Sequence, residues 1–296
     1  MLMNIRRTLG NILGLILVMG WNTLNHFDKR RHILSIYMHN PENGVFECVT
    51  NFLTKKKFRF ISTGELENIL SHKRLLTIKT AIVTLDDAWR GNLNNVIPIA
   101  VGANIPITIF TPIQPLEDGV MWMKWFRDEE LIDRFPEIAN PNPKLIPNAM
   151  RNELWRKLKP IKNFEREILT SDEVKLLSQK FSVITIGGHT YTHSILTNCN
   201  SKELDCEIIE AKEKLQEMIG KVVDVMAYPN GNYNDCVQKT CRKAGYKMAF
   251  TTEEGIYIDI EQTDPLCIPR NCVPNLYGKW ESIARALGIW QKIFRK

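Results

Sequence analysis

The chain has 296 residues, and its 44% hydrophobic and 24% charged residues give it the composition of an ordinary globular protein. This balance excludes disordered, collagen-like and coiled-coil proteins, and the length suits one large domain or two small ones. The formal net charge is +6, but residues 1–31 and 279–296 each carry +4, so the chain between them is slightly acidic. Because a nucleic-acid-binding protein usually places its basic surface on the folded body, we expect no nucleic-acid partner.

The first predicted element is a hydrophobic and basic segment at residues 1–31. It has no charged side chain between Arg7 and Asp28, and residues 9–21 are largely apolar. A secretion signal would be followed by a cleavage site between small residues, and this segment has none, so we expect it to stay attached as a membrane anchor or an interfacial helix. The alternative is a hydrophobic helix packed on the domain.

Short β-rich runs alternate with helical patterns through residues 32–275, which we expect to form one domain. The expected strands cover residues 33–38, 58–61, 80–85, 106–111, 181–186, 222–228, 247–251 and 266–270. The expected helices cover residues 45–54, 64–70, 92–101, 171–179, 202–219 and 235–244. About seven such alternations predict an α/β fold in which parallel strands close into a (β/α) barrel.

Two stretches depart from this alternation. Seven prolines divide residues 112–163, which we interpret as an insertion that caps a site. Residues 276–296 place apolar side chains at three- and four-residue spacings between Lys and Arg, the pattern of an amphipathic basic helix. This helix either packs on the core or lies on a membrane, and its tryptophans beside cations favour the membrane.

Polar residues follow two of the expected strands directly. The strand at 80–85 is followed by Asp86 and Asp87, and the strand at 181–186 by two glycines, His189 and, four residues later, His193. The carboxyl ends of parallel strands lie on one face of a barrel, where such barrels carry their chemistry. We therefore expect these four side chains to lie close together.

Their types predict a catalytic metal site. Alternate residues of a strand point to opposite sides, so Asp86 and Asp87 should have different roles. Histidines at i and i+4 meet on one helical face, and with one carboxylate they leave positions on a cation open for water and substrate. The other carboxylate can take the proton of that water. Each motif also has an ordinary alternative: a turn or helix cap for the aspartates, and a satisfied surface or core position for the histidines.

These residues resemble the motifs of the polysaccharide deacetylases, a family of metal-dependent carbohydrate esterases. Residues 84–88, Thr-Leu-Asp-Asp-Ala, resemble the family motif Thr-Phe-Asp-Asp-Gly, and residues 188–193, Gly-His-Thr-Tyr-Thr-His, resemble its His-Ser/Thr-x-x-His motif. Residues 227–233, 249–252 and 268–270 are similar to segments of the branch that includes the biofilm poly-N-acetylglucosamine deacetylases. Together these motifs span roughly residues 33–275.

The resemblance implies a distorted (β/α) barrel that hydrolyses N-acetyl groups of a glycan with a divalent metal, commonly zinc, with cobalt or manganese as alternatives. It assigns Asp86 as the general base, and Asp87, His189 and His193 as the metal ligands. It also implies a substrate-binding role for Tyr228, near which a backbone amide would stabilise the oxyanion.

The chain departs from the family pattern in two places. Ala227 stands where well-studied members have the arginine that orients the base, and Arg270 is the nearest substitute. The late histidine that serves as general acid is missing, because no histidine follows His193. His39 comes directly after the first strand and is the best replacement, and the alternative for it is a capping or core histidine.

Aromatic side chains offer a surface for the glycan. Trp89 and Trp122, with Trp125, either form a wall on which sugar rings stack or belong to a small core of the insertion. We expect a membrane-associated deacetylase of an N-acetylated glycan, at a bacterial-type cell envelope or the cytoplasmic membrane face, that contacts the membrane through both termini. The alternatives are a non-catalytic glycan-binding protein on the same fold and a metal hydrolase of another acyl substrate.

Overall fold

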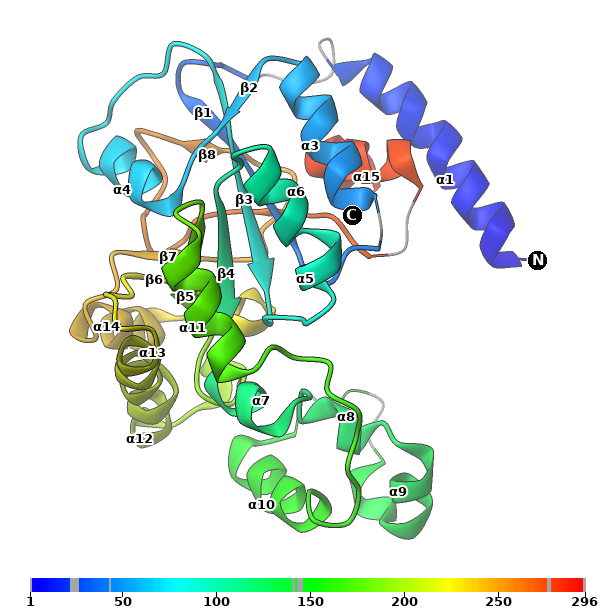
Figure 1. Cartoon of the computed structure of the whole chain (residues 1–296), viewed down its shortest axis with the longest axis vertical. Coiled ribbons are helices and arrows are strands. Elements are labelled where there is room, and N and C mark those ends of the chain that lie inside the picture. Colours follow the sequence, from blue (N-terminus) through cyan, green and yellow to red (C-terminus); the bar gives the residue numbers. More distant parts are fainter. Residues whose placement is uncertain are drawn as a thin grey trace.

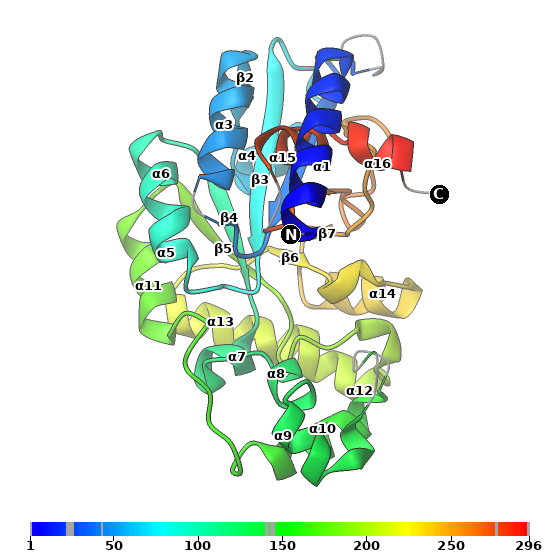
Figure 2. The same ribbon diagram turned by 90° about the vertical axis from the view of Figure 1, so that its right-hand side faces the viewer.

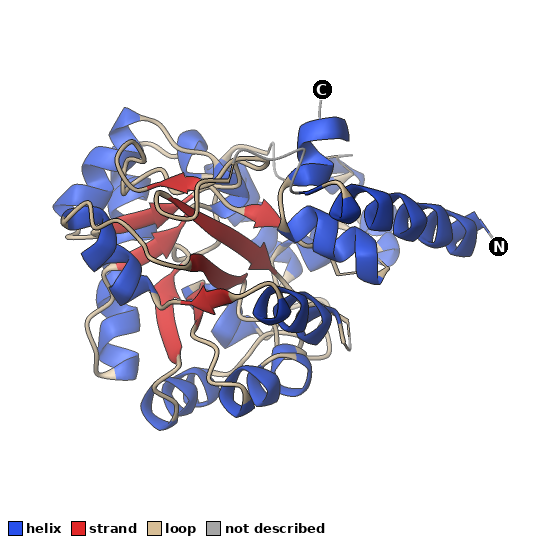
Figure 3. Ribbon diagram, turned by 90° about the horizontal axis from the view of Figure 1, so that it is seen from above, coloured by secondary structure: helices blue, strands red, loops and turns tan. Residues whose placement is uncertain are grey.

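The computed structural model describes residues 2–21, 27–42, 44–139, 142, 146–275 and 278–294. At its centre is a nine-stranded sheet that curls on itself, with the strand order β7-β6-β5-β4-β3-β1-β8 (Figures 1 and 3). β2 also pairs with β3, and β9 with β1. Among the described strands every pairing is parallel except that of β1 with β8. The predicted α/β fold with mainly parallel strands is confirmed.

The strands form where β-branched and aliphatic residues are concentrated. Their bounds are β1 His32–Met38, β2 Phe58–Phe60, β3 Lys79–Asp86, β4 Ile107–Thr111, β5 Ile184–Gly188, β6 Val225–Ala227, β7 Met248–Phe250, β8 Ile258–Asp259 and β9 Asn271–Cys272. Nearly every residue of β1, β3 and β4 is buried, which is why these strands are almost continuously apolar rather than alternating.

The chain after β7 closes the sheet. Ile268 forms an isolated parallel bridge with Phe250 at the end of β7, and three residues later β9 pairs with β1. The predicted strand at 266–270 is therefore reduced to a turn and a single bridge, from which the chain crosses to β9. This crossing closes the distorted barrel and carries Arg270 into its interior, where the side chain is fully buried.

Helices cover the outer face of the sheet (Figure 1). They are α3 Val45–Lys55, α4 Thr63–Ser71, α5 Asn92–Asn95, α6 Ile97–Gly102, α11 Ser171–Lys180, α12 Ser201–Leu204, α13 Ala211–Ile219 and α14 Asp235–Lys243. α11 begins with a capping box, because Thr170 and Glu173 each accept the other's backbone N–H through their side chains. A π-helical turn, Asp205–Glu210, joins α12 to α13 within the single helix predicted at 202–219.

The proline-rich insertion is mainly a small helical lobe at the lower end of the molecule in Figure 1. Its helices are α7 Ile113–Asp118, α8 Met123–Phe126, α9 Glu129–Arg134 and α10 Asn148–Leu158. The lobe has its own hydrophobic cluster, which includes Trp122, Trp125 and Trp155. It lies beyond the carboxyl ends of β3 and β4, on the side where the sequence predicts the site (Figure 1).

The two ends of the chain pack together on one side of the barrel (Figure 2). α1, Leu2–Met19, lies against α15, Lys279–Ala286. Gly10 and Gly14 allow the close approach, because a Cβ at Gly14 would lie 2.5 Å from the backbone nitrogen of Glu281. The terminal segments therefore form one structural unit.

Both terminal segments form helices that contact the body of the protein. Leu17 on α1 and Trp21 just after it are each 6% exposed, so the inner face of this helix packs on the core, as in the alternative interpretation. Gly288, with a φ of 72°, divides the predicted last helix into α15 and a short α16, Ile289–Phe294. Among the described residues no helix is both long and apolar enough to cross a membrane.

Candidate metal centre

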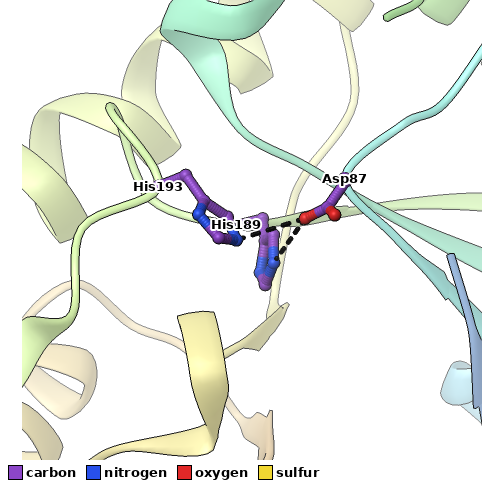
Figure 4. Close-up of side chains that lie close together, drawn as sticks. All are labelled: Asp87, His189 and His193. Atoms are coloured by element: carbon purple, nitrogen blue, oxygen red, sulfur yellow. Dashed lines mark ion pairs between the residues drawn. The ribbon is translucent and has the colours of Figure 1, made fainter. Parts of the chain in front are cut away.

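Loops at the carboxyl ends of two strands bring three potential metal ligands together (Figure 4). Asp87 directly follows β3, and His189 and His193 follow β5. Oδ1 of Asp87 lies 3.3 Å from Nε2 of His189 and 3.2 Å from Nε2 of His193. All three residues are buried, and their ligand atoms lie within 4.8 Å of one another. The structure thus brings the three predicted ligands to one point.

The hydrogen bonds around this cluster show that it fits a cation. Nδ1 of His189 lies 2.8 Å from the carbonyl oxygen of Ala227. A carbonyl can only accept, so Nδ1 carries the proton and Nε2 presents its lone pair to Asp87. Oδ1 of Asp87 is buried and receives no hydrogen bond from any residue that the structure describes. Lone pairs therefore converge on one point, an arrangement that a divalent cation stabilises.

The two histidines do not share a helical face, and this part of the prediction is wrong. Residues 189–193 form an irregular loop after β5, in which Thr190 has a φ of 68° and His193 a φ of 58°. The two left-handed residues turn the chain back on itself, so that the imidazole rings approach to 4.9 Å between centroids. The four-residue spacing of His189 and His193 therefore belongs to a strained loop and not to a helix.

Glu207, in the π-helical turn, holds this loop in place. Its carboxylate accepts the backbone N–H groups of Tyr191 (3.0 Å) and Thr192 (2.9 Å), and also the hydroxyls of Thr192 and Ser194. Arg151, from α10 of the insertion, donates to the same two hydroxyls at 2.9 and 2.8 Å. Glu207 and Arg151 are 4% and 3% exposed, so this network is shielded from solvent. The insertion thereby stabilises the loop that carries His189 and His193.

Asp86, the residue before Asp87, forms a buried ion pair with Arg270. The guanidinium binds both carboxylate oxygens, at 2.7 and 2.9 Å. It also donates to Thr84 and to the carbonyl of Thr251, and it stacks on Tyr37 at 4.4 Å. Burial acts to raise the pKa of Asp86, but Arg270, together with the nearby His189 and His39, outweighs burial and holds this pKa below its usual value. Asp86 is therefore ionised at neutral pH.

Two further predicted residues border the cluster. Nε2 of His39 lies 4.0 Å from Oδ2 of Asp87, and the His39 side chain is 37% exposed. The indole Nε1 of Trp89 donates a hydrogen bond of 3.0 Å to the same Oδ2. A groove of about 490 Å³ begins beside these residues. It is lined by Asn40, Trp89, Arg90, Gly91, Leu93, Asn94, Arg166 and Glu167.

Comparison with known proteins identifies the family. The family profile described as polysaccharide deacetylase matches residues 73–249, which is more than half of the chain. The chain belongs to the polysaccharide deacetylase family. The members of this family are carbohydrate esterases that hydrolyse N-acetyl groups, and the matched region contains Asp86, Asp87, His189 and His193.

Individual proteins resemble this family member in sequence or in fold. The chain is 31% identical over 87 residues to the polysaccharide deacetylase YxkH of Bacillus subtilis, an alignment that covers 29% of this chain and 30% of YxkH. It resembles the Streptococcus pyogenes deacetylase PplD in complex with acetate, with a TM-score of 0.60 and 18% identity over 87% of this chain and 98% of PplD. It also resembles IcaB from Ammonifex degensii, with a TM-score of 0.61 and 14% identity over 88% and 97%.

Two residues that the resemblance or the aromatic pattern assigned to the substrate lie elsewhere. Tyr228 is fully buried; its hydroxyl donates to the carbonyl of Leu266, and its backbone N–H donates to Phe250, so neither group faces the site. Trp122 is 5% exposed and packs edge-on against Phe126 within the insertion. The structure corrects these two assignments. The backbone N–H of Tyr228 is already hydrogen-bonded to Phe250, and Trp122 belongs to the hydrophobic core of the insertion.

The hydrogen bond from Trp89 to Asp87 should strengthen metal binding. We expect Trp89→Phe to weaken zinc binding about tenfold, because the ligand Asp87 loses the donor that orients its second oxygen. Titration calorimetry of the apoprotein with zinc measures this change. Trp122→Phe is the matched control, since the Trp122 Nε1 has no hydrogen-bond acceptor among the described residues. Equal zinc affinities in the two variants would contradict the role of Trp89.

Glu207→Gln should loosen the histidine loop. The glutamine amide can accept hydrogen bonds only through its oxygen, and its NH₂ group would face the N–H donors that the carboxylate now binds. We therefore expect the free energy of unfolding to fall by about 2 kcal/mol. Zinc binding should weaken about tenfold. Urea unfolding of the apoprotein and zinc titration measure the two effects. Glu203→Gln, on the exposed side of the neighbouring α12 turn, is the control, and an unchanged zinc affinity in Glu207→Gln would refute the prediction.

Proposed function

We propose that the protein is a metal-dependent deacetylase that hydrolyses N-acetyl groups on a saccharide. The observation that carries this proposal is the buried cluster of Asp87, His189 and His193 beside an ionised Asp86, in a chain of the polysaccharide deacetylase family. Different elements supply the two aspartates with different partners, histidines for Asp87 and a guanidinium for Asp86. This division is what a metal ligand and a general base require.

Zinc is the cation that this ligand set suits best. Two imidazoles and one carboxylate are common zinc ligands and leave positions open, and cobalt and manganese are the alternatives. Asp87, His189 and His193 would hold the ion. When bound, it supplies Lewis acidity, which polarises an acyl carbonyl and makes water more acidic.

Asp86 accepts the proton of the attacking water at a carboxylate oxygen. Both oxygens receive hydrogen bonds from Arg270, which fixes the orientation of the carboxylate and keeps it ionised. Arg270 thereby takes the place of the arginine that the family pattern has at position 227. Its four hydrogen bonds and its contact with Tyr37 leave it one orientation, so we assign it a positioning role.

His39 donates a proton from Nε2 to the leaving amine. It is the histidine that faces Asp87 from the exposed side of the site, where a substrate can enter. We expect His39→Gln to lower kcat for acetate release about a hundredfold while zinc binding stays within a factor of two or so, because general acid catalysis contributes factors of this size. Steady-state kinetics and zinc titration test this pair of outcomes. Full activity of the variant would remove His39 from the mechanism.

The groove beside Trp89 suits an extended saccharide. Its lining includes Trp89, which donates a hydrogen bond to Asp87. The lining is also rich in amide and charged side chains, which hydrogen-bond to sugar hydroxyls. The half-buried Trp89 offers an indole on which a sugar ring can pack. The proposed substrate is therefore a chain of N-acetylated sugars that lies along this groove with one acetamido group at the metal.

Acetate release from N-acetylglucosamine oligomers tests the function. The protein is stripped of metal and then given zinc, cobalt or manganese, and acetate is measured by a coupled enzyme assay. Metal-dependent release supports the deacetylase. Binding of the oligomers without acetate release would favour a non-catalytic glycan-binding protein, and release of acetate from simple acyl esters alone would favour a hydrolase of another substrate.

A further inference from the structure

α1 exposes a row of apolar side chains on the face that points away from the barrel. Leu9, Ile12, Ile16 and Met19 are 62%, 54%, 59% and 78% exposed, and their spacing of three and four residues places them on one side of the helix. We call these four residues the α1 ridge. Figure 3 shows that the first turns of α1 project from the body of the molecule. The ridge is therefore accessible to a large, flat partner.

Cations lie at both ends of the α1 ridge. Arg6 and Arg7 precede it, with Arg7 in an exposed ion pair with Glu42 (3.6 Å), and residues 2–19 include no acidic residue. At the other end the Nζ of Lys79 lies 5.1 Å from the centre of the Trp21 ring. Burial lowers the pKa of Lys79, and the nearby charges of Lys56 and Lys29 lower it further, so three like charges are held together there.

α16 extends the same surface. It contacts α1, and its Ile293 and Phe294 are 46% and 49% exposed beside the exposed Lys292. The helices α1 and α16 thus meet in space although they lie near opposite ends of the chain. The result is an apolar row within a cationic surround.

We propose that the α1 ridge and α16 dock on the surface of an anionic lipid bilayer, with α1 lying in the plane of the membrane. Apolar side chains of an amphipathic helix enter the boundary between headgroups and acyl chains, and lysines and arginines attract anionic headgroups. A second copy of the chain fits less well. A twofold contact through the ridge would place the same cations of two copies against each other, with no acidic residue of α1 to balance them.

Vesicle cosedimentation with the full chain tests this docking. We expect binding to vesicles of phosphatidylcholine and phosphatidylglycerol to be at least about tenfold tighter than binding to phosphatidylcholine alone, and to weaken as salt is added. Ile12→Glu/Ile16→Glu should lower the binding constant for anionic vesicles at least about tenfold. The control is Leu176→Glu/Val222→Glu, which changes two apolar residues that are 57% and 80% exposed and lie outside α1.

Charge reversal tests the cationic part separately. Lys29→Glu/Lys56→Glu should lower anionic-vesicle binding about tenfold, whereas the control Lys175→Glu/Lys202→Glu should retain most of it. Equal binding to neutral and anionic vesicles, or equal loss in ridge and control variants, would overturn the proposal. So would a dimer in solution that Ile12→Glu/Ile16→Glu converts to a monomer without any vesicle binding, because a second copy would then cover the ridge. Acetate release from soluble oligomers, measured on every variant, keeps these outcomes separate from those for the catalytic site.

Discussion

Asp86→Asn is expected to lower kcat for acetate release about a thousandfold while zinc stays bound. The asparagine amide has no charge and cannot take the proton of the attacking water, so the general base contribution is lost. Zinc should remain because Asp87, His189 and His193 approach one another without help from Asp86. Single-turnover kinetics and elemental analysis of the purified variant measure the two quantities.

The neighbouring aspartate provides the matched control. Asp87→Asn should lose both zinc and activity, since Oδ1 of Asp87 is the atom that both histidines approach. The two variants change the same chemical group at adjacent positions, and only their effects on zinc should differ. Turnover that survives Asp86→Asn at more than a few per cent would exclude Asp86 as the base and would assign proton removal to another group.

Arg270→Met is expected to lower the free energy of unfolding by about 3–5 kcal/mol, the cost of leaving a buried charge without its partner. Arg270 is fully buried, and its guanidinium provides both hydrogen bonds that stabilise the Asp86 carboxylate. Urea unfolding at neutral pH measures the loss. The double variant Asp86→Leu/Arg270→Met removes both charges and should recover much of the stability, because an apolar pair of similar volume is often as stable as a buried ion pair. A single variant as stable as the wild type would contradict the importance of the pair.

The stability deficit of Arg270→Met should depend on pH in a defined direction. In the wild type the pKa of Asp86 is lower in the folded protein than in the unfolded chain. The ion pair therefore stabilises the fold fully at pH values above the unfolded-state pKa. This stabilisation is lost as the pH falls through the folded-state pKa. Without Arg270 the desolvation of the carboxylate dominates and raises the pKa of Asp86. The deficit should therefore be largest at neutral pH and should shrink in acid, where both proteins carry a protonated Asp86.

Much of the site follows from where polar residues stand in the sequence. Asp86 and His189 come directly after runs that could only be buried strands, and the rule that parallel strands end on one face brings the two loops together. Arg270 is predicted for a different reason, because the expected base lacks its usual arginine partner at Ala227. The crossing at the end of the barrel explains how so distant a residue reaches Asp86.

Other parts could not be predicted from local pattern. The histidine spacing fits a helical turn, and nothing in the sequence distinguishes that turn from a loop with left-handed residues. The sequence leaves Trp122 open between a sugar-stacking wall and the insertion core, and the packing of that core decides between them. The role of Glu207 was missed, although a signal exists: in the predicted helix it stands on the apolar face with Leu204 and Ile208, where a carboxylate needs buried partners.

The closing segment of the barrel has a consequence for synthesis on the ribosome. The base and its arginine are 184 residues apart. At about 5–20 residues per second, Arg270 is therefore made roughly 10–40 s after Asp86. Until then the nascent barrel has no last strand, and no guanidinium neutralises the carboxylate in its interior. The emerging chain must keep Asp86 hydrated or protonated, so the catalytic pocket closes only after Arg270 has been made.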